Sequence, residues 1–143
     1  MKKHLRLKEY HGNMPKFKLN KLVRDKIIEH QIKAGTKPFY RLLDSKDHKR
    51  ELINKLIEEA REVLVVEEKN VASEIADVQQ ALDDLIEQYK LKKSDILAHQ
   101  ERKKQENGTF KKGIYIDYID ILEDDPFTDY YRSEPDRFPE ISD

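Results

Sequence analysis

The chain has 143 residues, of which 40% are charged and 37% hydrophobic, and its formal net charge is −1. This length suits one domain, but the small apolar share predicts a thin core that packs against a second copy of the chain. The lack of cysteine excludes disulfides and thiolate metal sites, and no apolar run is long enough to cross a membrane. We therefore expect a cytoplasmic protein that forms homodimers or higher homo-oligomers and has no membrane partner.

Charge is distributed unevenly along the sequence. Residues 1–26 carry nine Lys or Arg against two acids, and residues 123–143 carry eight acids against two arginines. Residues 1–15 follow no helical or strand period and predict an N-terminal extension. Nucleic-acid binding needs a basic stripe with interleaved aromatic residues on a folded face, and residues 44–100 supply none. We therefore expect no nucleic-acid partner.

The first predicted elements are two helices with a short strand between them. Asn20 is a suitable N-cap for a helix that ends at Gly35. The aromatic residues in segment 37–43 favour a small strand. Asp44 or Ser45 then caps a second helix, on which apolar residues recur with the helical period.

The second half of the chain predicts two more helices. A turn at residues 67–70 leads into a third helix over residues 71–89. Ser94 caps a fourth helix, which ends at Gly108. Residues 113–119 could pair with the first strand as a small two-stranded piece. The expected fold class is therefore all-α, a helical bundle around a central helical hairpin.

The expected domain organisation follows from these elements. The predicted helices lie within residues 16–122, which we expect to form one domain. Residues 123–143 combine acids, aromatic residues and prolines, and they predict an irregular tail. Few glycines and prolines elsewhere, with abundant Lys, Glu, Leu and Ile, are typical of a helical protein.

Acidic residues occupy positions where a helix would normally bury apolar side chains. Side chains three positions apart share one helix face, so Glu59 pairs with Glu62 and Glu74 pairs with Asp77. In a helical hairpin, positions at equal distance from the turn face each other, which places Glu62 against Glu74 and Glu59 against Asp77. Both pairs lie at the edge of the apolar stripe of their helix. The sequence therefore predicts that these four acids converge.

Four converging carboxylates would repel one another in partly desolvated surroundings. A divalent cation removes this cost, and Mg²⁺, for which Mn²⁺ can substitute, prefers oxygen ligands. The alternative is a solvated face of an acid-rich chain, and either pair alone favours that alternative. The equal distance of both pairs from one turn favours a metal site with four ligands, Glu59, Glu62, Glu74 and Asp77.

Other metal and nucleotide motifs do not fit this sequence. A di-iron bundle needs Glu three positions before His, and none of the five histidines has it. The sequence also lacks the H-E-x-x-H zinc motif, a P-loop, a G-x-S-x-G elbow and a glycine-rich dinucleotide loop. The acid cluster is therefore the feature on which a catalytic prediction depends.

Three motifs resemble segments of a known superfamily and follow one another along the chain in the same order. The stretch "KLIEEAREVL" at 55–64 followed by "SEIADVQQAL" at 73–82 is similar to the E-x-x-E…E-x-x-D signature of the all-α nucleoside triphosphate pyrophosphohydrolases, the MazG and phosphoribosyl-ATP pyrophosphohydrolase superfamily. The stretches "NKLVRDKI" at 20–27 and "KKQENGTFKKGIYI" at 103–116 resemble the opening and closing segments of its phosphoribosyl-ATP pyrophosphohydrolase-like subgroup. The resemblance covers residues 16–120.

The resemblance implies Mg²⁺-dependent hydrolysis of a nucleoside triphosphate between its α- and β-phosphates, giving a monophosphate and pyrophosphate. Such an enzyme could clear non-standard nucleotides. Glu58 and Glu59 are the candidate catalytic residues, with Glu58 as a general base or as a ligand of a second metal. A triphosphate also needs cations, and the candidates are Arg24, Lys26, Lys55, Lys103 and Lys104. For each of these cations the alternative is a solvated surface charge.

Two other functions stay open at this point. A phosphoribosyl-ATP pyrophosphohydrolase of histidine biosynthesis would use the same chemistry on another substrate. A non-catalytic helical interaction module would carry the same acids without binding metal. No residue recognisably reads a nucleobase, so the sequence does not name the base.

Overall fold

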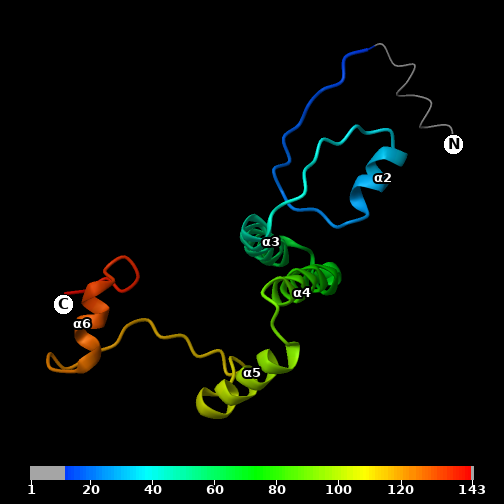
Figure 1. Cartoon of the computed structure of the whole chain (residues 1–143). Coiled ribbons are helices and arrows are strands. Elements are labelled where there is room, and N and C mark those ends of the chain that lie inside the picture. Colours follow the sequence, from blue (N-terminus) through cyan, green and yellow to red (C-terminus); the bar gives the residue numbers. More distant parts are fainter. Residues whose placement is uncertain (1–11, 143) are drawn as a thin grey trace. The chain divides into compact units, whose positions relative to one another are not determined.

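The computed structural model describes residues 12–142. All regular secondary structure in this range is helical (Figure 1), which confirms the all-α class. The chain divides into two compact units, one ending at Arg102 and the other beginning at Lys103. Of the predicted extension, residues 1–11 lie outside the described residues, and residues 12–15 are exposed and irregular. Within residues 12–142, no helix combines the length and the apolar character that a membrane span requires.

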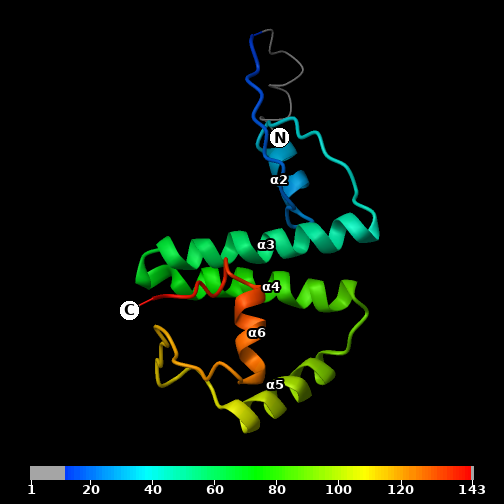
Figure 2. The same ribbon diagram turned by 90° about the vertical axis from the view of Figure 1, so that its left-hand side faces the viewer.

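The first unit is built on a helical hairpin. Helix α3 (Ser45–Val65) and helix α4 (Val71–Gln88) pack side by side with opposite directions (Figure 2). The predicted cap of α3 is confirmed, because the side chain of Asp44 accepts a hydrogen bond from the backbone N–H of Asp47 at 2.8 Å. A short 3₁₀ turn, η1 (Glu68–Asn70), joins the two helices where a turn was expected. The predicted central hairpin is therefore observed.

The hairpin has a small core. Leu52 and Ala81, which are 3% and 5% exposed, are the only buried apolar side chains among residues 12–142. Among the described residues, the apolar stripes continue onto exposed surface, since Ile57 is 46% exposed and Ile75 is 54% exposed. A single copy of the hairpin thus buries only part of the apolar surface that its helical periodicity creates.

The first predicted helix is shorter than expected. Helix α2 (Ile27–Lys33) begins seven residues after Asn20, which has a positive φ of 47° and is not a helix cap. Residues 20–26 are irregular, so the prediction of a helix was wrong there. Leu22 and Val23 are half-buried in this segment, and basic side chains on either side of them form ion pairs with α3 and α4. These tertiary contacts outweigh a weak helical propensity.

The predicted two-stranded piece is not formed, and this prediction was wrong. Residues 37–43 and 113–119 have no regular secondary structure, and they lie in different compact units. Their aromatic and β-branched residues fit a pleated surface. A strand also needs a neighbouring strand with which to form backbone hydrogen bonds, and an isolated pair of strands is marginally stable at best.

The second unit contains a helix in the segment predicted to be irregular. Helix α5 (Lys93–Asn107), close to its predicted bounds, leads into this unit, and helix α6 (Pro126–Ser133) follows the extended stretch. The side chain of Asp125 accepts a hydrogen bond from the backbone N–H of Phe127 at 2.8 Å, and Pro126 occupies the first turn. Proline is tolerated there because the first N–H groups of a helix have no intrahelical partner. The prolines were therefore misread as evidence against a helix.

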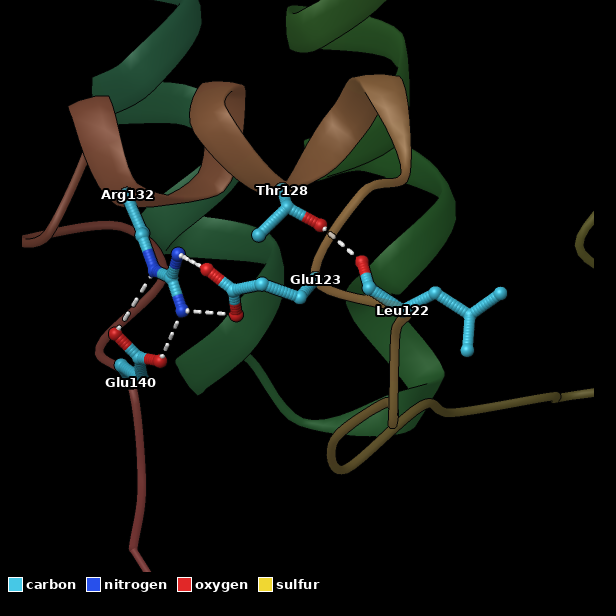
Figure 3. Close-up of polar contacts among 5 residues, drawn as sticks. All are labelled: Leu122, Glu123, Thr128, Arg132 and Glu140. Atoms are coloured by element: carbon cyan, nitrogen blue, oxygen red, sulfur yellow. Dashed lines mark hydrogen bonds and ion pairs between the residues drawn. The ribbon is translucent and has the colours of Figure 1, made fainter.

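Arg132, in the last turn of α6, binds one acid from the segment before this helix and one from the segment after it (Figure 3). The guanidinium of Arg132 donates to both oxygens of Glu123, at 2.5 and 2.9 Å, and to both oxygens of Glu140, at 2.9 and 3.2 Å. These hydrogen bonds and the charge of Arg132 lower the pKa of Glu123 and of Glu140. The hydroxyl of Thr128 donates to the carbonyl of Leu122 at 2.7 Å. The tail is therefore a small ordered motif held by charge-assisted hydrogen bonds.

Candidate metal centre

Three carboxylates from the two hairpin helices meet at one point. One oxygen each of Glu59, Glu74 and Asp77 lies within 4.8 Å of the other two. Glu74 and Asp77 share a face of α4 because they are three positions apart. Glu59 comes from α3 and is 9% exposed, which is unusual for a glutamate. The predicted facing pair of Glu59 and Asp77 is thus present in the structure.

Glu62, the fourth predicted ligand, is not part of this group. Its side chain is exposed, and the three clustered acids do not include it. The pairing of equidistant positions assumed a tight symmetric turn. Instead, Val66 and Glu67 are extended before the 3₁₀ turn begins, so the connection is longer on the α3 side. A ligand role for Glu62 stays a prediction.

Lys55, one turn earlier on α3, forms ion pairs with Glu59 and with its neighbour Glu58. Its Nζ lies 2.8 Å from Oε1 of Glu59 and 3.2 Å from Oε2 of Glu58. Burial alone would lower the pKa of Lys55, but the hydrogen bonds and charges of the two glutamates outweigh it and raise that pKa. Burial likewise tends to raise the pKa of Glu58, but Lys55 and Lys21 outweigh it and lower that pKa. Lys55 and Glu58 are therefore both charged at neutral pH.

Two further cations come from residues 19–26, a segment that we call the strap. Arg24 donates from Nη2 to Oδ1 of Asp77, and Nζ of Lys21 lies 3.5 Å from Oε1 of Glu58. Sequence reasoning identified Arg24 as a candidate cation but missed Lys21. The available signal was the placement of two basic residues on either side of Leu22 and Val23, which are half-buried.

Two of these acids and all three cations line a shared pocket of about 330 Å³. Its charged lining residues come from the strap and from both hairpin helices: Lys21, Arg24, Lys55, Glu59 and Asp77. The rest of the wall is apolar except for Gln31 on α2. A pocket of this composition can hold a ligand that carries both positive and negative charge next to an uncharged part.

The remaining predicted cations lie elsewhere. Lys26 is exposed at the start of α2, and its carbonyl accepts the backbone N–H of His30 at 3.1 Å. It does not line the pocket. Lys103 and Lys104 lie near the end of α5, in the second unit. Substrate roles for these three lysines stay predictions.

The residue types of the cluster fit a hard divalent cation. All three donors are carboxylate oxygens, which Mg²⁺ and Mn²⁺ prefer, and their spacing lets them share one ion. In the structure, Arg24 and Lys55 pair with two of the three carboxylates. A metal would therefore have to take over carboxylates that already have cationic partners.

Comparison with known proteins gives no match to this chain, whether with protein-family models, with curated proteins or with solved structures.

Proposed function

We propose that this protein is a Mg²⁺-dependent nucleoside triphosphate pyrophosphohydrolase that releases pyrophosphate and acts on non-standard nucleotides. The observation that carries the proposal is the meeting of Glu59, Glu74 and Asp77, two of which, Glu59 and Asp77, line a pocket together with Lys55 and Arg24. A polyphosphate with its divalent ion presents charges of both signs to these groups. The resemblance of the hairpin motifs to the pyrophosphohydrolase superfamily supports the same reaction.

Each group at the site has a role in this proposal. Glu59, Glu74 and Asp77 would hold the Mg²⁺, with Glu62 as a further ligand if its side chain turns inward. When bound, Mg²⁺ would supply charge neutralisation at the phosphates and activation of water. Lys55 would orient the carboxylate of Glu59, to which it is hydrogen-bonded, and would face the phosphates.

The lowered pKa of Glu58 argues against its use as the general base. A general base works best when its pKa is close to the working pH, and the pKa of Glu58 is lowered instead. Glu58 is suited to anchoring Lys55 and Lys21, both of which lie within 3.5 Å of its oxygens. We therefore favour Glu59 over Glu58 as the residue nearest to the attacking water.

We also propose that two copies of the chain pair through the uncovered face of the hairpin. Ile53 and Ile57 on α3, and Ile75 and Leu82 on α4, are each between 39% and 54% exposed. Covering apolar surface stabilises an association by about 25 cal/mol per Å². Light scattering at micromolar concentration should therefore give more than the 17.1 kDa of one chain. A species of one-chain mass alone would contradict the pairing.

The activity is tested by product analysis. Purified protein with Mg²⁺ or Mn²⁺ is incubated with a panel of nucleoside triphosphates and with phosphoribosyl-ATP. We expect pyrophosphate as the first product from at least one of them. Preference for phosphoribosyl-ATP would indicate the enzyme of histidine biosynthesis. Orthophosphate as the first product would place cleavage at another bond and would contradict the mechanism.

A matched pair of variants tests whether the cluster carries the activity. Asp77→Asn should abolish most of it, since Asp77 belongs to the three-carboxylate group. Asp84→Asn, on the same helix, is the control, because Asp84 is exposed and accepts a hydrogen bond from Gln80 at 3.2 Å. Calorimetric titration with Mn²⁺ completes the test. No Mn²⁺ binding and no turnover would favour a helical interaction module.

A further inference from the structure

The strap places positive charge on Asp77, a carboxylate that the proposed metal would need, and on the neighbouring acid Glu58. Arg24 pairs with Asp77, and Lys21 with Glu58, although both basic residues are far from the hairpin in sequence. Asn20, within the strap, has a positive φ of 47°. Leu22 and Val23 are half-buried between the two cations. The strap therefore meets the hairpin through two ion pairs and two partly buried apolar side chains.

Arg24 and a divalent cation would compete for the negative charge of Asp77. Arg24 donates to Oδ1 of Asp77, and an oxygen of this same carboxylate lies within 4.8 Å of oxygens of Glu59 and Glu74. A guanidinium held at that oxygen repels an ion placed at the meeting point of the three carboxylates. The side chain of Arg24 is 56% exposed, and exposed ion pairs are weak, so the exchange is readily reversible.

The charges of the site indicate which ligand drives this exchange. Four acids face three cations, namely Glu58, Glu59, Glu74 and Asp77 against Lys21, Arg24 and Lys55. A free divalent ion would displace cations from their partners and leave them beside a positive charge. A divalent ion that arrives with a polyphosphate also brings an anion with which the displaced cations can pair. The second case is electrostatically favoured.

We propose that Arg24 is a built-in counter-ion, which holds Asp77 until a metal–polyphosphate complex binds and then transfers to the phosphates. Metal and polyphosphate are consequently taken up together, and each raises the affinity for the other. The inference rests on the proposed metal site and adds a mode of regulation to it. Its consequence is that the protein binds free Mg²⁺ poorly and selects nucleotides that already carry their metal.

The test measures Mn²⁺ binding without turnover. Electron paramagnetic resonance gives the concentration of free Mn²⁺ during titration of the full-length chain, with and without inorganic pyrophosphate, after correction for the complex that pyrophosphate forms with Mn²⁺ in solution. For the wild type we expect pyrophosphate to raise the Mn²⁺ affinity at least about fivefold, the lower end of typical coupling between sites. By reciprocity, Mn²⁺ must raise the pyrophosphate affinity by the same factor.

Variants of Arg24 show whether this residue competes with the metal for Asp77 or positions Asp77 for metal binding. Arg24→Gln should bind Mn²⁺ alone more tightly than the wild type does, and it should lose most of the coupling. Arg24→Lys keeps the charge and should retain coupling, and it serves as the second variant if Arg24→Gln does not fold. The matched control is Lys93→Gln, since Lys93 pairs with Asp83 at 3.0 Å outside the pocket. This control should behave as the wild type.

The outcomes distinguish the inference from the function on which it rests. If the wild type binds Mn²⁺ and Arg24→Gln has the same affinity and coupling, the counter-ion role is wrong. If Arg24→Gln binds Mn²⁺ more weakly, Arg24 positions Asp77 and does not compete for it, which also overturns the proposal. If the wild type binds no Mn²⁺ under either condition, the proposed metal site is itself wrong.

Discussion

Replacing Glu59 with glutamine removes one negative charge from the candidate centre while keeping the shape of the side chain. In metal-free protein, this change weakens the contact with Lys55, which is 2.8 Å long and joins side chains that are only 11% and 19% exposed. A hydrogen bond between charged groups contributes about 1.5–3 kcal/mol. Lys55 keeps Glu58 at 3.2 Å, and the repulsion between Glu59 and the other acids also disappears. We therefore expect a loss of about 1–2 kcal/mol, below the middle of that range.

Thermal melting in the presence of a chelator measures this loss. In a unit of this size, a change of 1 kcal/mol shifts the melting temperature by about 4–8 °C. Glu59→Gln should therefore melt clearly below the wild type, whereas Glu62→Gln, at an exposed position, should melt at the wild-type temperature. Saturation with Mn²⁺ to 100 times the dissociation constant should stabilise the wild type by about 2.7 kcal/mol and Glu59→Gln by less.

Two results would refute this reasoning. If Glu59→Gln melts with the wild type in chelator, the contact with Lys55 contributes nothing to stability. If Mn²⁺ shifts the melting temperatures of Glu59→Gln and the wild type equally, Glu59 is not a ligand, and its carboxylate serves only as the partner of Lys55.

Three further predictions concern the core, the tail and the start of the chain. Leu52→Ala should lower the free energy of unfolding in urea by about 2–3 kcal/mol, the low end for a buried leucine, because the open hairpin can relax around the cavity. The control is Leu64→Ala on the same helix, where the side chain is 84% exposed, and it should cost less than about 0.5 kcal/mol in a single copy. Arg132 lowers the pKa of Glu123 and of Glu140 below the ordinary value of 4.5. Their ion pairs with Arg132 therefore stabilise the tail fully above pH 4.5, and this stabilisation is lost as the pH falls through the lowered pKa values. Tyrosine fluorescence of the tail should therefore change below about pH 4.5, and an Arg132→Gln variant should lack that transition. A chain that begins at Met14 should keep its melting temperature and its activity, and a drop of several degrees would show that the removed residues pack on the fold.

The hairpin could be predicted from sequence because its signals are local. A capping acid at residue 44, apolar residues at helical spacing and a polar turn determine α3 and α4 without reference to the rest of the chain. The same spacing brings Glu59 against Glu74 and Asp77. Residues 20–26 were mispredicted because their conformation depends on ion pairs with partners that are distant in sequence. Such pairs leave no periodic pattern.

The tail shows a second kind of failure. Its prolines and acids predict irregular structure, but Asp125 followed by Pro126 is also the start signal of a helix. Arg132 could not be identified as the centre of the motif, because its partners lie eight and nine positions away, which is neither a helical nor a strand spacing. Opposite charges at such separations pair only after the chain has turned, and the turn itself was not predicted.

The connectivity of the hairpin also determines the order in which the site assembles during folding. The acids lie on consecutive helices joined by a short turn, and contacts that are this local form early because little chain entropy is lost in closing the loop. Arg24 reaches Asp77 across 53 positions, so this contact closes later. The carboxylates therefore meet before one of their cationic partners arrives, and divalent ions present at that stage would relieve their mutual repulsion. Mg²⁺ is thus expected to accelerate refolding of the first unit, even at concentrations that leave the native protein's stability unchanged.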